Sequence, residues 1–247
     1  MIRYKIYPSL LDCFTDYENS DLVWEKYWGG SDDPPHTPEQ FRKIQFQTLI
    51  NRINRVPMKW EESEAADRGT AFNEIVDCLI EHRDSNKMEL HHIGDNPITA
   101  IKAIYRDRTF TFPIEPCRTF ANYFKGAITQ QYVEAAIPTI YGDVLIYGFI
   151  DELMPQFVAD IKMTSRYNFG KFRDHSQHLV YPYCLLHSGN DITTFEYVVY
   201  SNNEMFKECY HFVPERDNEI LRKKIESFIE FLLTNKNLIT DNKIFNQ

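Results

Sequence analysis

The chain has 247 residues and a formal net charge of −9, with 43% hydrophobic and 15% aromatic residues. This composition is typical of a folded globular protein and excludes disordered and fibrous chains. The acidity argues against a protein that coats nucleic acid nonspecifically, because phosphate contacts need clustered Lys and Arg, although a local basic groove remains compatible with it. We expect one domain, with an N-terminal helical elaboration (1–62), a core (63–201) and a C-terminal helix region (202–247).

The cysteines and the hydropathy of the chain indicate where in the cell the protein is expected. The five cysteines are scattered and form no CxxC pair, so the sequence predicts reduced thiols rather than a disulfide framework or a zinc or iron–sulfur cluster. No apolar run is long enough to cross a bilayer, and the first residues lack the hydrophobic stretch of a signal peptide. We therefore expect a cytoplasmic protein that has no membrane partner.

The first half of the chain predicts two helices and a hairpin. Thr37 and Pro38 are typical of a helix start, and the helix should run to about Arg55. A second helix should run from near 63 to 82–85, with a buried stripe at Phe72, Ile75, Val76 and Leu79. The segment 98–113 is strand-like with a turn at 106–107, and 115–125 should form a short helix closed by glycine.

The second half predicts most of a sheet. Three strands are expected at 130–137, 144–151 and 156–163, and their short links favour an antiparallel meander. A helix (174–187), a strand (193–200) and a closing amphipathic helix (215–233) follow. The expected fold is therefore α/β, a central mixed sheet with an antiparallel meander flanked by helices.

Asp151 ends one of these strands. The segment 144–150 has apolar residues at both odd and even positions, which predicts a strand buried on both faces. A carboxylate at the end of such a strand needs a metal ion or a salt bridge to offset its burial. The alternative is that Asp151 lies in a solvated turn.

The next strand contains Asp160-Ile161-Lys162, in which Asp160 and Lys162 share one face. Asp151 can approach Asp160 across a tight turn, which gives two carboxylates and an ammonium group in one pocket. Mg²⁺ or Mn²⁺ held by Asp151, Asp160 and the Ile161 carbonyl could then activate water, which Lys162 would orient or help to deprotonate. The alternative is an ordinary Asp–Lys pair on an exposed strand.

Two helices offer flanking residues. Gln177 and Tyr181 are four residues apart on one helix face and can reach the same site, although a buried Tyr with a Gln at its border would give the same pattern. In the earlier helix, Asn73 borders the apolar stripe and is a candidate metal ligand, while Gly69 allows a close backbone approach. Glu74 lies farther from the stripe; we expect it to be solvated and keep it as the less favoured ligand.

Taken in order, the strings G-x-x-x-N, G-x-x-D, D-x-K-x-T and Q-x-x-x-Y resemble the PD-(D/E)xK nuclease superfamily, most closely its RecB-like and phage (lambda-type) exonuclease branch. They span about Gly69 to Tyr181, and the opening Tyr7–Leu11 is similar to the start of many members. The resemblance implies a restriction-endonuclease-like core.

The resemblance also implies roles for the matching residues. Asp151 and Asp160 would bind the divalent metal, Lys162 would be the catalytic lysine, and Gln177 and Tyr181 would position DNA or that lysine. Asn73 stands where branch members commonly have His, and an amide oxygen is a poorer ligand, which leaves open whether one or two metals bind. Ala159 replaces the proline of the motif.

The resulting hypothesis is a metal-dependent DNA exonuclease of phage or mobile-element recombination or DNA repair, in a bacterial or phage-infected cell. Its substrate would be linear duplex or single-stranded ends, a single-strand annealing protein is a candidate partner, and oligomers are compatible with the sequence. The alternatives are a structure-specific endonuclease and an inactive nucleic-acid- or protein-binding module. Candidate DNA contacts are the backbone at Gly69 and the side chains of Thr164, Arg166, Lys171 and Arg173; His175 and Tyr167 are further candidates.

Overall fold

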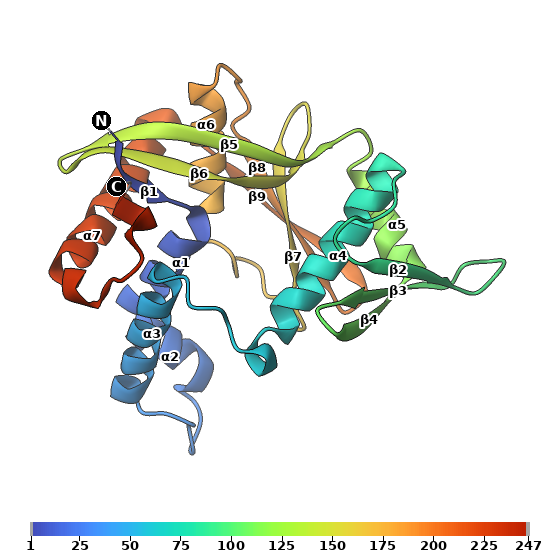
Figure 1. The fold of residues 1–247 in the computed structure, drawn as a ribbon, viewed down its shortest axis with the longest axis horizontal. Helices are drawn as coiled ribbons and strands as arrows, with labels where there is room; N and C mark the ends of the chain where they lie inside the picture. The colour runs from blue at the N-terminus through green and yellow to red at the C-terminus, as the bar shows by residue number, and fades with distance from the viewer. Residues whose placement is uncertain (1, 246–247) are drawn as a thin grey trace.

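The computed structural model describes residues 2–245, which form two sheets flanked by helices (Figure 1). Six strands make the main sheet, and a three-stranded antiparallel sheet lies beside it. The strands of the main sheet are β1 (Ile2–Ile6), β5 (Ile128–Thr139), β6 (Gly142–Leu153), β7 (Val158–Met163), β8 (Thr194–Ser201) and β9 (Glu204–His211). Those of the small sheet are β2 (Glu89–Ile93), β3 (Ala100–Tyr105) and β4 (Arg108–Pro113).

Seven α-helices surround the sheets in the described part of the chain. They are α1 (Pro8–Glu18), α2 (Ser20–Trp28), α3 (Pro38–Ile53), α4 (Glu64–Glu81), α5 (Ile114–Tyr123), α6 (Gln177–His187) and α7 (Pro214–Thr234). Short 3₁₀ turns occur at Trp60–Glu62, Lys236–Leu238 and Asn242–Phe245. No helix within residues 2–245 is long and apolar enough to cross a membrane.

The central strand β6 has an edge that two other strands share. Along one edge β6 pairs with β5 over its whole length, from Gly142 to Leu153. Along the other edge, β1 runs parallel to the first part of β6 as far as Ile146, and β7 pairs antiparallel only at Glu152 and Leu153. Between these two partners the edge of β6 is open, and this opening positions the candidate site.

The main sheet is mixed, and its strands β7 and β8 are covered on both faces (Figure 1). Alternate residues of β7 and β8 point into two separate apolar cores, as the strand period of two requires. Val158 and Tyr197 belong to the core that α1, α3, α6 and α7 close. Ala159 and Val198 belong to a second core, built with α4, α5 and the small sheet. The chain is thus an α/β protein in which a mixed sheet is flanked by helices.

The elements expected from the second half of the sequence are confirmed. The meander β5–β6–β7 is antiparallel, and α6, β8 and α7 follow it. In the first half, Thr37 accepts a hydrogen bond from the Gln40 backbone and forms a capping box at the start of α3. Arg106 and Asp107 have φ of 49° and 63°, which makes the tight turn between β3 and β4.

Other elements were not expected. The sequence did not predict β1, α1, α2, β2 or β9, and β9 makes the 202–247 region contribute a strand to the main sheet. The expectation that β6 is buried on both faces was wrong. Val144, Ile146 and Ile150 are buried on one face, whereas Phe149 on the other is 55% exposed. Tyr132 of β5, beside Phe149, is also exposed, so this face of the β5–β6 ribbon is only partly covered.

The five cysteines are free thiols in the structure.

Candidate functional site

Asp151 lies where β6 and β7 separate. The antiparallel pairing of β6 with β7 ends at Glu152 and Ala159. Ile161 lies beyond this pair on β7, and its backbone N–H donates to Asp151 Oδ2 at 2.9 Å instead. The Asn73 amide nitrogen donates to the same oxygen at 3.2 Å. Asp151 is partly buried, so the solvated-turn alternative is not what the structure has.

Asp160 and Lys162 share one face of β7, as the alternation predicted. Lys162 Nζ lies 2.7 Å from Asp160 Oδ2, and their side chains are 24% and 5% exposed. The pair is therefore not an exposed surface salt bridge. An ion pair removed from water in this way is held in place by further hydrogen bonds.

Gln177, the first residue of α6, supplies these bonds. Its Oε1 accepts from Lys162 Nζ at 2.8 Å, and its Nε2 donates to Asp160 Oδ1. Its Nε2 also lies 3.5 Å from the hydroxyl of Tyr181, one turn later. Gln177 thus contacts Asp160 and Lys162 directly, and Tyr181 reaches the site through Gln177.

A glycine makes room for Tyr181. A Cβ added at Gly148 on β6 would lie 2.8 Å from Tyr181 Cε1, closer than real Cβ contacts allow. The ring of Tyr181, which is 4% exposed, therefore packs directly against the β6 backbone. This contact explains the glycine of Gly148-Phe149-Ile150-Asp151 by packing alone.

The charges at the site are strongly coupled. Burial and the neighbouring Asp160 carboxylate raise the pKa of Asp151, against the Ile161 N–H and Lys162, which lower it. Burial lowers the pKa of Lys162, but the Asp160 and Asp151 carboxylates outweigh burial and the pKa is raised. Lys162 is therefore a stable ammonium group, suited to orienting or stabilising an anion rather than to accepting a proton.

The donor set fits a hard divalent cation. Within residues 2–245 no three His, Cys, Asp or Glu side chains converge in a group that could hold a metal ion. Mg²⁺ is often held by only one or two carboxylates and keeps several waters. Asp151 and Asp160, whose mutual repulsion a cation would relieve, meet that requirement. Asn73 presents its amide nitrogen to Asp151, so it would have to turn to offer its oxygen to a cation.

Glu74 is not solvated, contrary to expectation. Its side chain is 1% exposed and lies 2.7 Å from Arg83 and 2.8 Å from Lys87. Both cations follow the end of α4 and fold back over it. Glu74 is thus held by ion pairs. Burial and the Glu74 carboxylate raise the pKa of Asp77 on the same helix, and burial and Asp77 raise the pKa of Glu152 on β6.

The expected DNA contacts divide into two groups. A Cβ added at Gly69 would meet no atom within 4 Å beyond its own helix in the described residues, and Arg166 and Arg173 are exposed. Lys171 instead donates to Thr164 Oγ1 at 2.6 Å and to the Arg166 carbonyl at 2.8 Å. Lys171 and Thr164 therefore hold the loop after β7 together.

Sequence reasoning missed Asp12. This residue of α1 accepts a hydrogen bond from the Ser176 backbone at 2.6 Å and lies 3.7 Å from His175 Nδ1. Its carboxylate is among the charges that raise the pKa of Lys162. Asp12 thus fixes the start of α6, and with it Gln177. No local pattern marks it, because its partners lie more than 160 residues away.

Comparison with known proteins adds little to this picture. No family model matches the chain, and no curated protein matches it. The crystal structure of SSO0001 superposes with a TM-score of 0.48 and 10% identity, over 92% of this chain and 76% of that one. The functional assignment therefore rests on the geometry of the site.

Proposed function

We propose that the protein is a metal-dependent DNA nuclease of the PD-(D/E)xK superfamily with a restriction-endonuclease-like core. The observation that carries the proposal is the convergence of Asp151, Asp160 and Lys162 at the separation of β6 and β7, with Gln177 joining Lys162 to Asp160. Four strings that are unremarkable alone thereby meet in one place. Their order along the chain is the one that the resemblance requires.

Phosphodiester hydrolysis needs a nucleophilic water, and it needs positive charge beside the scissile phosphate. A divalent cation bound to Asp151 and Asp160 would supply Lewis acidity and a water of lowered pKa. Lys162 would contribute its ammonium group to the developing charge on the phosphate. Gln177 keeps that group 2.8 Å from its amide oxygen, and so fixes its position before substrate arrives.

DNA is the proposed substrate, and exonucleolytic cleavage of linear ends is the proposed mode. Exposed Arg166 and Arg173 lie in the segment between β7 and α6 that borders the site, where they can meet phosphates. The open backbone at Gly69 offers a second approach, from α4.

The test uses purified full-length protein with Mg²⁺ or Mn²⁺, on linear duplex, single-stranded and covalently closed circular DNA. We expect loss of linear DNA while circles are spared. Asp160→Asn and Lys162→Met should abolish cleavage and leave the fold intact. Lys125→Met, which changes an exposed lysine outside the site, should retain cleavage. Cleavage of circular or branched DNA would indicate the endonuclease alternative, and cleavage of RNA alone would overturn the choice of substrate.

One observation favours a second candidate, a binding module without activity. Asn73 faces Asp151 with its amide nitrogen, whereas a metal ligand would present its oxygen. Calorimetry that detects no Mn²⁺ binding by the intact protein, with DNA binding retained, would support this candidate over the nuclease.

A further inference from the structure

Four aromatic rings are connected on one face of the β5–β6 ribbon, and we call them the aromatic surface. Tyr147 and Phe149 belong to β6, Tyr132 belongs to β5, and Tyr7 directly follows β1. Ring centroids are 6.0 Å apart for Tyr7 and Tyr147, 6.3 Å for Tyr132 and Tyr147, and 5.2 Å for Tyr132 and Phe149. Phe149 and Tyr132 are 55% and 42% exposed. Single exposed apolar side chains are common, whereas a connected exposed group more often marks a binding surface.

The aromatic surface lies on the same face of β6 as Asp151. Tyr147, Phe149 and Asp151 occupy alternate positions of this strand, so their side chains share a face. Ile146 and Ile150, at the intervening positions, point to the other face and belong to the core. Alternate residues of a strand are about 7 Å apart. Phe149 is therefore the next side chain to Asp151 along this face.

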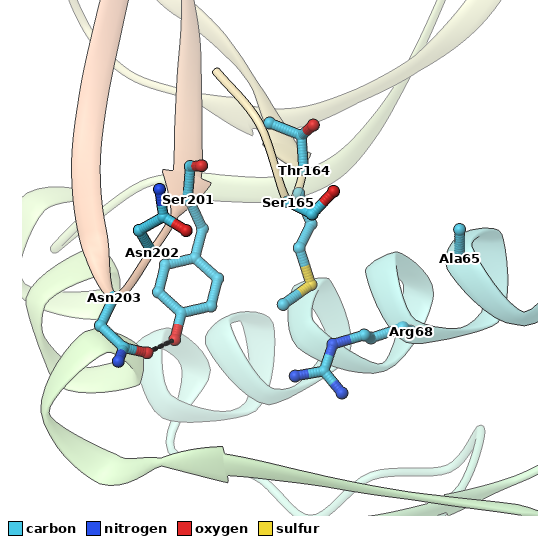
Figure 2. Close-up of a pocket in the computed structure, with 9 residues that line it drawn as sticks. Ala65, Arg68, Thr164, Ser165, Ser201, Asn202 and Asn203 are labelled. Carbon is cyan, nitrogen blue, oxygen red and sulfur yellow. Dashed lines mark hydrogen bonds between the residues drawn. The ribbon is translucent and has the colours of Figure 1, made fainter.

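The pocket at the end of β7 offers no comparable ring. This pocket, of about 410 Å³, is lined by one aromatic residue, Tyr200 (Figure 2). Tyr200 stacks on Phe72, with centroids 4.8 Å apart and an interplanar angle of 4°, and its hydroxyl donates to Asn203 Oδ1 at 2.7 Å. It is only 5% exposed. Its ring is therefore part of the second core, whereas Phe149 and Tyr132 have ring surface to offer to a ligand.

Positive charge lies at the end of the aromatic surface away from Asp151. Tyr7 also lines a pocket of about 520 Å³ between the end of α3 and the linker to α4. Three cations, Arg52, Arg55 and Lys59, line this pocket with a single carboxylate in the described chain. Arg55 and Lys59 are paired with carboxylates, whereas Arg52 is exposed and forms no ion pair within residues 2–245. In a chain of net charge −9, an unpaired guanidinium favours a phosphate.

One carboxylate limits how a charged ligand can lie on the rings. Glu134, opposite Tyr147 on β5, accepts a hydrogen bond from the Tyr132 hydroxyl at 2.5 Å. This bond holds the Tyr132 ring in place before a ligand arrives, which lowers the entropy cost of binding. The same carboxylate repels a phosphate placed over it. A nucleic-acid strand on this face therefore has its bases on the rings and its phosphates away from Glu134.

We propose that the aromatic surface binds single-stranded DNA by stacking bases on Phe149 and Tyr132, with the strand running from Arg52 to Asp151. Every base has a π-face, so this stacking is independent of sequence. A base inside a duplex is already stacked on both faces, so only an unpaired strand can use the rings. This inference rests on the proposed function, and it makes single-stranded or frayed ends the form of DNA that the protein holds.

The test measures binding to the full-length Asp160→Asn protein by fluorescence anisotropy. The probes are a single-stranded oligonucleotide, a fully abasic strand of the same length, and a blunt duplex. Phe149→Ala in this protein should weaken binding of the single strand about 5- to 100-fold, as loss of base stacking does. It should leave binding of the abasic strand and of the duplex unchanged, because neither presents a free base face.

Two further variants and a control accompany Phe149→Ala. Tyr132→Ala should have the same selective effect, and Phe149→Trp, which keeps an aromatic ring, should retain binding. Tyr27→Ala removes an aromatic side chain of α2 that is 62% exposed and lies outside the aromatic surface, and should change nothing. Because all the replaced side chains are exposed, the fold should be kept, which circular dichroism checks.

Arg52→Met provides an independent measurement of the charged end. It should reduce the slope of log affinity against log salt for the single strand by about 0.7, the value for one phosphate contact. Arg118→Met, an exposed arginine of α5 that does not line this pocket, is the matched control and should leave the slope unchanged.

The outcomes separate two failures. Absence of binding to any DNA by the Asp160→Asn protein overturns the proposed function, and this inference with it. Full binding of the single strand by Phe149→Ala and Tyr132→Ala, or an equal loss for the abasic strand, overturns the aromatic surface alone. A dimer in sedimentation velocity that Phe149→Ala dissociates, with affinity for the strand unchanged, would assign this face to self-association and overturn the inference in the same way.

Discussion

The amide of Gln177 joins Lys162 to Asp160. Its oxygen accepts from the Lys162 ammonium group at 2.8 Å and its nitrogen donates to the Asp160 carboxylate. Because an amide carries a donor and an acceptor on one rigid plane, a single side chain fixes the separation of two charged groups.

If the protein is the nuclease proposed above, replacing Gln177 by Met should lower kcat about 10- to 100-fold, as loss of an orienting partner does at metal sites in general. The direct Lys162–Asp160 contact at 2.7 Å remains, so the fold should be retained, with a loss of about 1–3 kcal/mol because Asp160 Oδ1 loses its partner. Steady-state cleavage assays and thermal melts measure the two effects. Gln47→Met, at an exposed position of α3, is the control, and an unchanged kcat in the Gln177 variant would contradict the role of the amide.

Two glycines should respond in opposite ways to alanine. Gly148→Ala places a methyl group 2.8 Å from Tyr181, and should destabilise the fold by about 1–3 kcal/mol. Gly69→Ala, inside α4 with open space around it, should stabilise the helix by about 0.5–1 kcal/mol and yet weaken DNA binding. Chemical denaturation and anisotropy test both variants. Equal affinity of Gly69→Ala and the parent for DNA would show that no ligand approaches that backbone.

Asn73→Asp should strengthen metal binding and weaken the metal-free fold. The new carboxylate would lie beside Asp151, now 3.2 Å from the Asn73 amide, where like charges repel and a cation relieves them. We expect Mn²⁺ affinity to rise about tenfold, and metal-free stability to fall by about 1–2 kcal/mol. Isothermal titration calorimetry and melts with and without Mn²⁺ measure both quantities. Asn73→Ala, which removes the amide and adds no charge, should show neither the gain in affinity nor the repulsion.

His178 should make folding sensitive to acid. Its ring stacks on Tyr210 with centroids 4.5 Å apart, and burial, followed by the nearby charge of Lys224, lowers its pKa from 6.5 to about 4. Between these two values the unfolded chain binds a proton that the folded chain does not, so stability falls as the pH falls.

The measurement is urea denaturation of the wild type and of His178→Gln at pH 7.5 and 4.5. The wild type should lose about 2 kcal/mol relative to the variant on acidification. All other titrating groups are common to the two chains and drop out of the comparison. A difference that does not change with pH would mean that His178 is protonated equally in both states.

Local patterns predicted the parts of the site that lie within one element. Asp160 and Lys162 share one face of β7, and Gln177 and Tyr181 share one face of α6, as the sequence predicted. Strand and helix periods fix which side chains share a face. The buried stripe of α4 around Phe72 follows from the same period.

Contacts between distant segments were not predictable in this way. Glu74 projects away from the Asn73 side of α4, and nothing local indicates that Arg83 and Lys87 return to bury it. β1 is short, and its only sheet partner in the described chain is β6, more than half the sequence away. The position of Asp12 depends on this pairing of β1 with β6, since α1, which carries Asp12, follows β1 directly.

The shared edge of β6 also sets the order in which the site can be assembled. β1 is made first but has no strand to join until residue 146 has been synthesised, and Gln177 follows later still. Contacts this distant in sequence form slowly, after local structure. A ribosome-bound fragment that ends before α6 therefore lacks the complete arrangement of Asp160, Lys162 and Gln177, so such a fragment should lack the proposed nuclease activity.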